Sequence, residues 1–197
     1  MEVNEAVSRI SEIHAHLLKS ELFRGYRPWP TAMTGAIAGI AAAVQATVLP
    51  AANAHEFALF WLVVGAACAS LCFGDVARNY LRASPGERRR TLVALGQFAP
   101  TVVVGVIVSA MLIDRGPQYL PGLWSLLYAL GLFSSRLHLP RSVGWVGLWF
   151  LATGTLLAVS GDAWRTPWSM GISFGCGQVA LAAVFLHSIE RSDRGHA

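Results

Sequence analysis

Three polar side chains lie close together near the end of a long apolar stretch. Asp75, Arg78 and Asn79 stand three and four residues apart, a spacing that puts them on one face of an α-helix. Charged groups inside a membrane segment are costly and often mark functional positions. Asp75 could form a local ion pair that eases the charge at a helix end. It could also face a vestibule and contact His187, Arg136 or a ligand, and both interpretations stay open.

Two glutamines in other apolar stretches stand beside residues that weaken a helix. Gln97 is followed by Pro100, which leaves the Gly96 carbonyl without its usual helical donor, and Gln178 follows the glycines at 175 and 177. Interrupted helices of this kind are typical of transporter binding sites, although structural kinks are the simpler explanation. We define the predicted polar layer as the set Asp75, Arg78, Asn79, Gln97, Pro100, Gln178 and His187.

Other reactive side chains do not form a recognisable metal, haem or catalytic site. Cys68 and Cys72 share a helix face, but no histidine or carboxylate stands beside them at metal-ligand spacing. The sequence contains no Ser/His pair, Glu-rich metal motif or Gly-rich phosphate loop in a plausible context. Asp75 lacks the further aspartates of membrane phosphatidyl-alcohol transferases. We predict no catalytic residue, no metal, no cofactor and no enzymatic activity.

Six apolar runs carry these residues and must position them. Each run is close to the roughly 20 residues that cross a bilayer as a helix. The runs cover residues 31–50, 57–80, 91–113, 120–137, 143–160 and 167–189. They predict an all-α, polytopic membrane protein with six transmembrane helices.

The basic residues of the chain alternate between the gaps that separate these runs. Of the 15 Lys and Arg residues, 13 lie before the first run, in or beside the gaps between the second and third and between the fourth and fifth, or after the sixth. Only Arg115 and Arg165 lie in the other three gaps. The positive-inside rule therefore predicts that both termini face the cytoplasm, as in a bacterial inner-membrane protein. When each residue's depth is counted from the end of its run, the predicted polar layer lies in the cytoplasmic half of the membrane. No carboxylate lies near the predicted midplane, which argues against proton- or sodium-coupled transport.

The composition excludes an ordinary water-soluble domain. The chain has 197 residues, of which 54% are hydrophobic and 13% are charged, against about 25% charged in soluble domains. The net charge is +4, and the basic residues lie at the predicted membrane borders, where anionic lipids are their expected partner. We therefore predict no direct nucleic-acid binding. The predicted parts are a cytoplasmic arm (1–30), a transmembrane bundle (31–189) and a cytoplasmic tail (190–197).

The arm has the pattern of an amphipathic helix. Apolar residues recur at intervals of three and four, and we call them the apolar seam: Val3, Ala6, Ile10, Ile13 and Leu17. A helix that lies on a membrane surface normally has a polar face rich in Lys and Arg, but this arm also carries Glu2, Glu5, Glu12 and Glu21, which anionic lipid would repel. We therefore expect Val3, Ile10, Ile13 and Leu17 to dock onto protein rather than onto lipid.

Two pairs of glycines favour close packing between helices. Gly35 and Gly39 are four residues apart in the first run, and Gly171 and Gly175 are four apart in the sixth. Such small-residue pairs let helix backbones approach closely. The partner helix could belong to the same chain or to a second copy in a homo-oligomer.

The arm also carries a family resemblance. The segments ISEIHAHL at 10–17 and SELFRGYR at 20–27 resemble the opening of uncharacterised bacterial six-helix inner-membrane proteins, and the likeness extends through Gly144 and Trp145 to the sixth run. The resemblance implies no activity. It implies a cytoplasmic protein partner, namely a transcriptional regulator.

These patterns lead to two functional hypotheses. The first is a non-enzymatic membrane module that senses or tethers, with the N-terminal helix and the basic gap at 78–90 receiving a cytoplasmic partner. The alternative is a small-solute transporter or channel lined by the polar layer. A cavity enclosed by that layer would favour transport, and a filled bundle would favour a partner.

Overall fold

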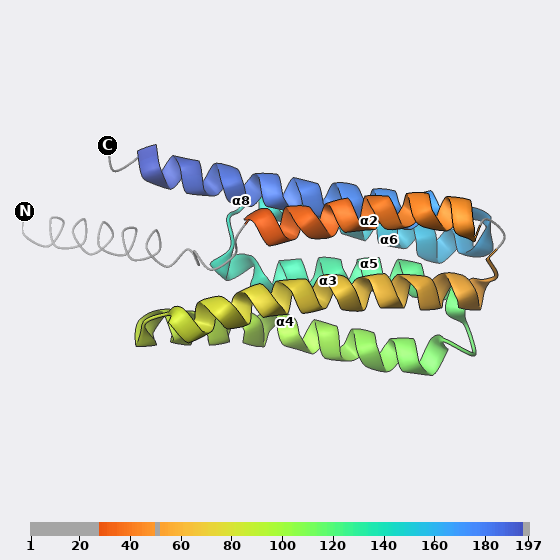
Figure 1. Cartoon of the computed structure of the whole chain (residues 1–197), viewed down its shortest axis with the longest axis horizontal. Helices are drawn as coiled ribbons and strands as arrows, with labels where there is room; N and C mark the ends of the chain where they lie inside the picture. Colours follow the sequence, from red (N-terminus) through yellow and green to blue (C-terminus); the bar gives the residue numbers. More distant parts are fainter. Residues whose placement is uncertain (1–27, 50–51, 195–197) are drawn as a thin grey trace, which may run out of the picture.

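The computed structural model describes residues 28–49 and 52–194, which are all-helical apart from short turns (Figure 1). Within this part of the chain, five helical stretches are long and apolar enough to cross a membrane. They are α2 (Pro28–Val48), α3 (Ala54–Arg82), α4 (Pro85–Leu112), α6 (Val143–Ser160), and the column formed by α7 (Pro167–Met170), η4 (Gly171–Cys176) and α8 (Gly177–Arg194). The predicted all-α class is confirmed.

The fourth apolar run forms a shorter helix than we predicted. Helix α5 (Leu120–Ser134) has 15 residues, follows the short turn η1 (Pro117–Tyr119), and passes into the 3₁₀ turn η2 (Ser135–His138). It is not among the five stretches above. Residues 1–27 of the predicted arm, with Val3, Ile10, Ile13 and Leu17, lie outside the described residues, as does the end of the predicted tail. Residues 28–30, which we assigned to the arm, form the start of α2.

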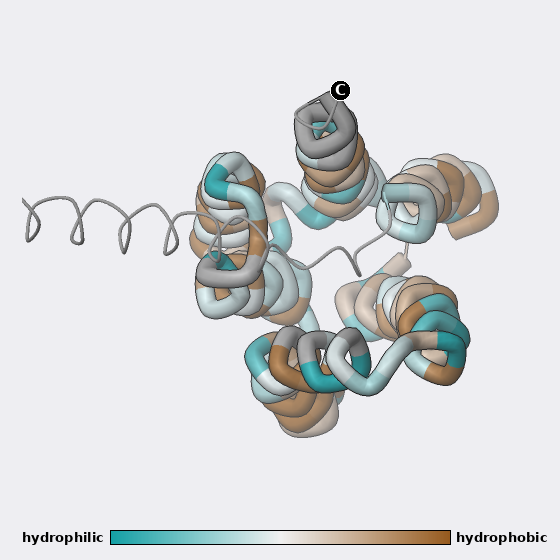
Figure 2. The backbone as a smooth tube through the Cα atoms, turned by 90° about the vertical axis from the view of Figure 1, so that its left-hand side faces the viewer, coloured by the Kyte–Doolittle hydropathy of each residue, from teal (hydrophilic) through white to brown (hydrophobic). Residues whose placement is uncertain are grey.

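The described helices run up and down along one long axis, so their turns gather at two ends (Figure 1). We call one end the basic end, because it holds the turns at 83–84 and 139–142 together with Arg82, Arg88, Arg89, Arg136 and Arg141. The opposite end holds the turns at 113–116 and 165–166, with acidic and basic residues mixed. Figure 2 views the bundle from the basic end, where hydrophilic residues lie nearest the viewer.

Local sequence sets where several helices begin and end. Asn53 and Glu56 form a capping box at the start of α3, in which Glu56 N donates to Asn53 Oδ1 at 2.9 Å and Asn53 N donates to Glu56 Oε2 at 3.0 Å. Prolines open α2, α4 and α7, where a missing N–H costs little. Gly161 ends α6 with a positive φ of 52°, a conformation that favours glycine.

An arginine from α4 holds the turn between α3 and α4. Arg88 Nε donates to the carbonyls of Tyr80 and Ala83, both at 3.1 Å, and Arg88 Nη2 donates to Leu81 O at 3.0 Å. Its guanidinium also lies 5.5 Å from the centre of the Tyr80 ring. Tyr80 O also accepts from Ala83 N at 3.3 Å, and Arg88 adds side-chain donors for the Leu81 and Ala83 carbonyls at the end of α3. We call residues 78–90 the hairpin tip.

The glycine pairs pack within the chain. A Cβ added to Gly35 would lie 3.0 Å from Gly175 O, and one added to Gly175 would lie 3.7 Å from Gly39 N. Further along, Gly171 packs against Ala42 of α2. Helix α2 therefore lies directly on η4, which confirms the prediction of close packing and assigns the glycines to an intramolecular contact.

Helices α5 and α6 form a second close contact. A Cβ on Gly122 would lie 2.6 Å from the backbone nitrogen of Ala158, and one on Gly154 would lie 2.9 Å from the backbone nitrogen of Leu126. The buried core divides between these two contacts. One part centres on Val143, Val146 and Phe150, and the other on Ala42, Phe57 and Met170.

Candidate functional site

Four aromatic rings meet in the interior of the bundle. Tyr128 of α5 lies 5.6 Å from Phe98 of α4, 4.6 Å from Phe150 of α6 and 5.9 Å from Phe174 of η4, measured between ring centres. Phe150 and Phe174 are 5.2 Å apart. We call these four residues the aromatic cluster. It connects α4 with the α7–η4–α8 column, the two elements that carry Gln97 and Gln178.

Small residues allow these rings to pack tightly. Phe98 lies over Gly131 of α5, where an added Cβ would come within 2.5 Å of its ring, and Phe150 packs against Gly177. Phe150 is completely buried. Side chains rather than empty space therefore fill the region between α4, α5, α6 and η4.

Gln178 of the predicted polar layer faces α2. Its Cβ would lie 3.2 Å from a Cβ added at Gly35, and the residue is buried. The helix is irregular just before it, because residues Gly171–Cys176 form a π-helical segment. The weak point that the sequence predicts near Gln178 is thus seen as a change of helical pitch.

Gln97 lies on α4 next to Phe98, the residue that packs against Gly131 of α5. Its Oε1 is buried and has no hydrogen-bond partner among the described residues. The hydroxyl of Ser135, in η2 at the same end of the bundle, is likewise buried and unpaired within the described part of the chain. Pro100 lies inside α4, which continues on both sides of it.

Asp75 has a partner on its own helix. Asn79 Nδ2 donates to Asp75 Oδ2 at 3.0 Å, and the pair is partly buried. Asn79, rather than Arg78, provides the local contact that the spacing suggested. Arg78 is exposed on the same helix, close to the basic end.

His187 lies near the end of α8, where it is exposed. The predicted polar layer is thus distributed over α3, α4 and α8, and Asp75 with Asn79 is the hydrogen-bonded pair that the structure gives within it. Among the described residues, no group of three or more His, Cys, Asp or Glu side chains could hold a metal ion.

Comparisons with protein-family models, with curated proteins and with solved structures find no match to this chain. Function must therefore be argued from the bundle itself. Two further polar groups in its interior bear on that argument.

The first is a hydroxyl cluster, which we define as Ser125, Thr153 and Ser173. Ser173 Oγ lies 3.2 Å from Ser125 Oγ and 2.9 Å from Thr153 Oγ1, so the cluster connects α5, α6 and η4. Trp149 Nε1 donates to Ser173 O at 2.9 Å. Ser173 O also accepts from the backbone N–H of Gly177 at the end of η4, so this carbonyl uses both of its lone pairs.

The second is a buried glutamine near the opposite end of α2. Gln45 is fully buried, and its Oε1 accepts from Trp61 Nε1 at 2.8 Å. Its Nε2 has no partner in the described part of the chain. Gln45 and the hydroxyl cluster lie toward the opposite end, so buried polar groups of the described bundle extend beyond the predicted polar layer.

Proposed function

We propose that this protein is a non-enzymatic integral membrane module that senses or tethers, and that it engages a cytoplasmic protein through its N-terminal helix. The filled interior of the bundle is the observation that carries this proposal. A solute path needs a space lined by polar groups. The aromatic cluster occupies the region where such a path between Gln97 and Gln178 would run.

The proposed topology has six membrane crossings with both termini in the cytoplasm. Helix α5 has 15 residues and turn η2 has four. Together they are about 30 Å long, which is enough to cross a hydrocarbon core of about 30 Å. The gathering of arginines at one end supports placing that end in the cytoplasm. A bacterial inner membrane is the setting that fits this arrangement.

The hairpin tip offers a second surface on the same side as the N-terminal helix. Helices α3 and α4 have 29 and 28 residues, about 43 and 42 Å, so each exceeds the hydrocarbon core by about 12 Å. Figure 1 shows that this hairpin extends beyond the start of α2 at the basic end. Arg78, Arg82 and Arg89 are exposed there, while Arg88 keeps the turn in shape.

The proposed partner is a cytoplasmic protein with an apolar groove that can receive the apolar seam of the arm. A transcriptional regulator is the partner implied by the resemblance to uncharacterised bacterial membrane proteins. Acidic groups beside the groove would complement the exposed arginines of the hairpin tip. The lipid bilayer is the second partner of the module, and a homo-oligomer is compatible with the exposed faces of α3 and α4.

The test is to capture partners from detergent extracts of cells that express the intact chain, a chain without residues 1–24, or a seam variant with Ile13→Glu and Leu17→Glu. The matched control carries Ser8→Glu and Ala15→Glu, which add the same charge away from the seam. We expect both the deletion and the seam variant to lose one protein that the intact chain and the control retain. Membrane insertion should be equal in all four.

Identical sets of captured proteins from all four chains would contradict the proposal. Loss of the partner from the control as well would show that charge on the arm matters and the apolar seam does not, which also contradicts it. A charge-reversed hairpin, Arg82→Glu with Arg89→Glu, should weaken capture without abolishing it. A partner that binds this variant as it binds the intact chain would remove the hairpin tip from the proposal.

A small-solute transporter or channel is the second candidate. It is favoured by the buried polar atoms of Gln97 and Ser135, which have no partner in the described part of the chain. Buried polar atoms in a membrane protein usually have a partner, and water or a solute would supply one between α4 and η2. Solute flux into reconstituted vesicles tests this candidate. We expect Gln97→Leu and Gln178→Leu to reduce any flux at least about tenfold if these amides line the path; unchanged flux would remove them from it.

A further inference from the structure

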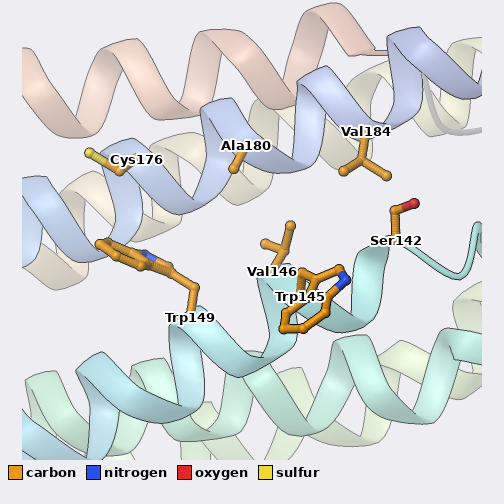
Figure 3. A pocket seen from close by; sticks show the side chains of 7 residues that line it. All are labelled: Ser142, Trp145, Val146, Trp149, Cys176, Ala180 and Val184. Carbon is orange, nitrogen blue, oxygen red and sulfur yellow. The ribbon is translucent and has the colours of Figure 1, made fainter.

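An apolar groove runs along the surface between α6 and α8. Its cavity has a volume of about 410 Å³ and is lined by Ser142, Trp145, Val146, Trp149, Cys176, Ala180 and Val184. Figure 3 shows Ser142 and Val184 at one end of the groove and Trp149 and Cys176 at the other. Neither proposed function above uses these residues.

The groove covers the depth of one bilayer leaflet. It begins at Ser142, just before α6 at the basic end, and reaches Trp149, about 9 Å further along the helix from Val143. On the other wall, Cys176 at the end of η4 lies 12 residues before Ser188, the end of the apolar span, and so is about 18 Å from that border. Half of a hydrocarbon core is about 15 Å. The groove therefore extends from the membrane border to roughly the middle of the bilayer.

The mouth of the groove presents groups that suit an anion. Arg141 lies in the turn just before α6, where Gly144 N donates to its carbonyl at 3.1 Å, and it is the neighbour of Ser142, which lines the groove. On α8, His187 is three residues after Val184 and is exposed. Trp145 is 76% exposed, as expected for an aromatic side chain at a membrane border.

We propose that this groove binds one phospholipid of the basic-end leaflet, with an acyl chain along the apolar walls and an anionic headgroup at Arg141, Ser142 and His187. A guanidinium and a hydroxyl donate charge-assisted hydrogen bonds to a phosphate. The volume lies within the range of small-ligand sites, roughly 300–1,000 Å³. The proposal uses the basic end of the bundle and does not depend on a protein partner.

A second copy of the chain is a poorer occupant of the groove. Two copies in one membrane share the same orientation, so a two-fold contact through this groove would bring both Arg141 residues and both His187 residues to the same border. Like charges at close range oppose such a contact. An anionic lipid neutralises the same residues.

Native mass spectrometry of the full chain, with dioleoyl phosphatidylglycerol or dioleoyl phosphatidylcholine added to the detergent, tests the proposal. We expect one phosphatidylglycerol to be retained per chain, with an affinity about tenfold higher than that for phosphatidylcholine. Arg141→Gln should remove this preference and keep weak binding of both lipids. Ala180→Trp, which fills the exposed groove, should abolish binding of both.

Ala67→Trp is the matched control, because Ala67 is an exposed small residue in the span of α3 and lies away from the groove. It should bind phosphatidylglycerol as the unmodified chain does. Equal binding of the two lipids by the unmodified chain, or unchanged binding by Ala180→Trp, would overturn the proposal. A dimer that forms through the groove and excludes lipid would overturn it too. If Ala180→Trp fails to fold, the loss of headgroup preference in Arg141→Gln decides the question alone.

Discussion

Replacing Phe150 with alanine is expected to destabilise the protein by about 3–5 kcal/mol, the usual cost of removing a large buried ring. Phe150 is fully buried, lies 4.6 Å from the Tyr128 ring and 5.2 Å from the Phe174 ring, and packs against Gly177. Its removal leaves a cavity that rigid neighbouring helices cannot close. The aromatic cluster would lose the ring that connects α6 to α8.

Thermal unfolding of the detergent-solubilised protein, followed by loss of the monodisperse peak on size-exclusion chromatography, measures this effect. Val159→Ala provides the control, because Val159 is on the same helix and is 83% exposed. Its midpoint should stay close to that of the unmodified chain. If the two variants unfolded at the same temperature, the interior around Phe150 would not be packed as described.

Replacing Gly122 with alanine is expected to destabilise the contact between α5 and α6 by about 1–3 kcal/mol. The new methyl group would lie 2.6 Å from Ala158 N and 2.8 Å from Ala158 Cα. Backbone atoms cannot rotate away as a flexible side chain can, so the helices must separate. Separation would also disturb the hydroxyl cluster, which connects the same two helices.

Gly65→Ala is the matched control for this substitution. Gly65 lies in the span of α3, and an added Cβ there meets nothing within 4 Å. The same thermal assay should show a lower midpoint for Gly122→Ala and an unchanged or higher midpoint for Gly65→Ala. The reverse order would contradict the close approach of α5 to α6.

Helix positions could largely be predicted from the sequence, because long apolar runs bounded by proline, glycine and charge leave few alternatives to helices. Helix α6 begins and ends at the predicted residues 143 and 160. Helix α5 was predicted too long because the predicted run was extended past Ser135 and Arg136 to Leu137, while the backbone tightens into a 3₁₀ turn after Ser134. Hydropathy does not report this change of pitch.

The arrangement of polar residues was harder to predict, because depth along a helix does not determine which neighbour a side chain faces. Gln97 and Gln178 have similar predicted depths, yet Gln178 packs on α2 while the buried Oε1 of Gln97 has no partner among the described residues. Gln45 was overlooked because it stands near the end of its apolar run. The partner of its Oε1 is Trp61, 16 residues away in sequence and on the next helix.

The contact between α2 and η4 has a consequence for how the protein is made. Gly35 and Gly39 lie against residues near Gly175, which the ribosome adds about 140 residues later. At about 5–20 residues per second, the packing face of α2 stays open to lipid or to insertion factors for roughly 7–28 seconds. The first described helix is therefore covered only when the last one enters the membrane, so a chain that stalls before α8 would expose its glycine face to quality control.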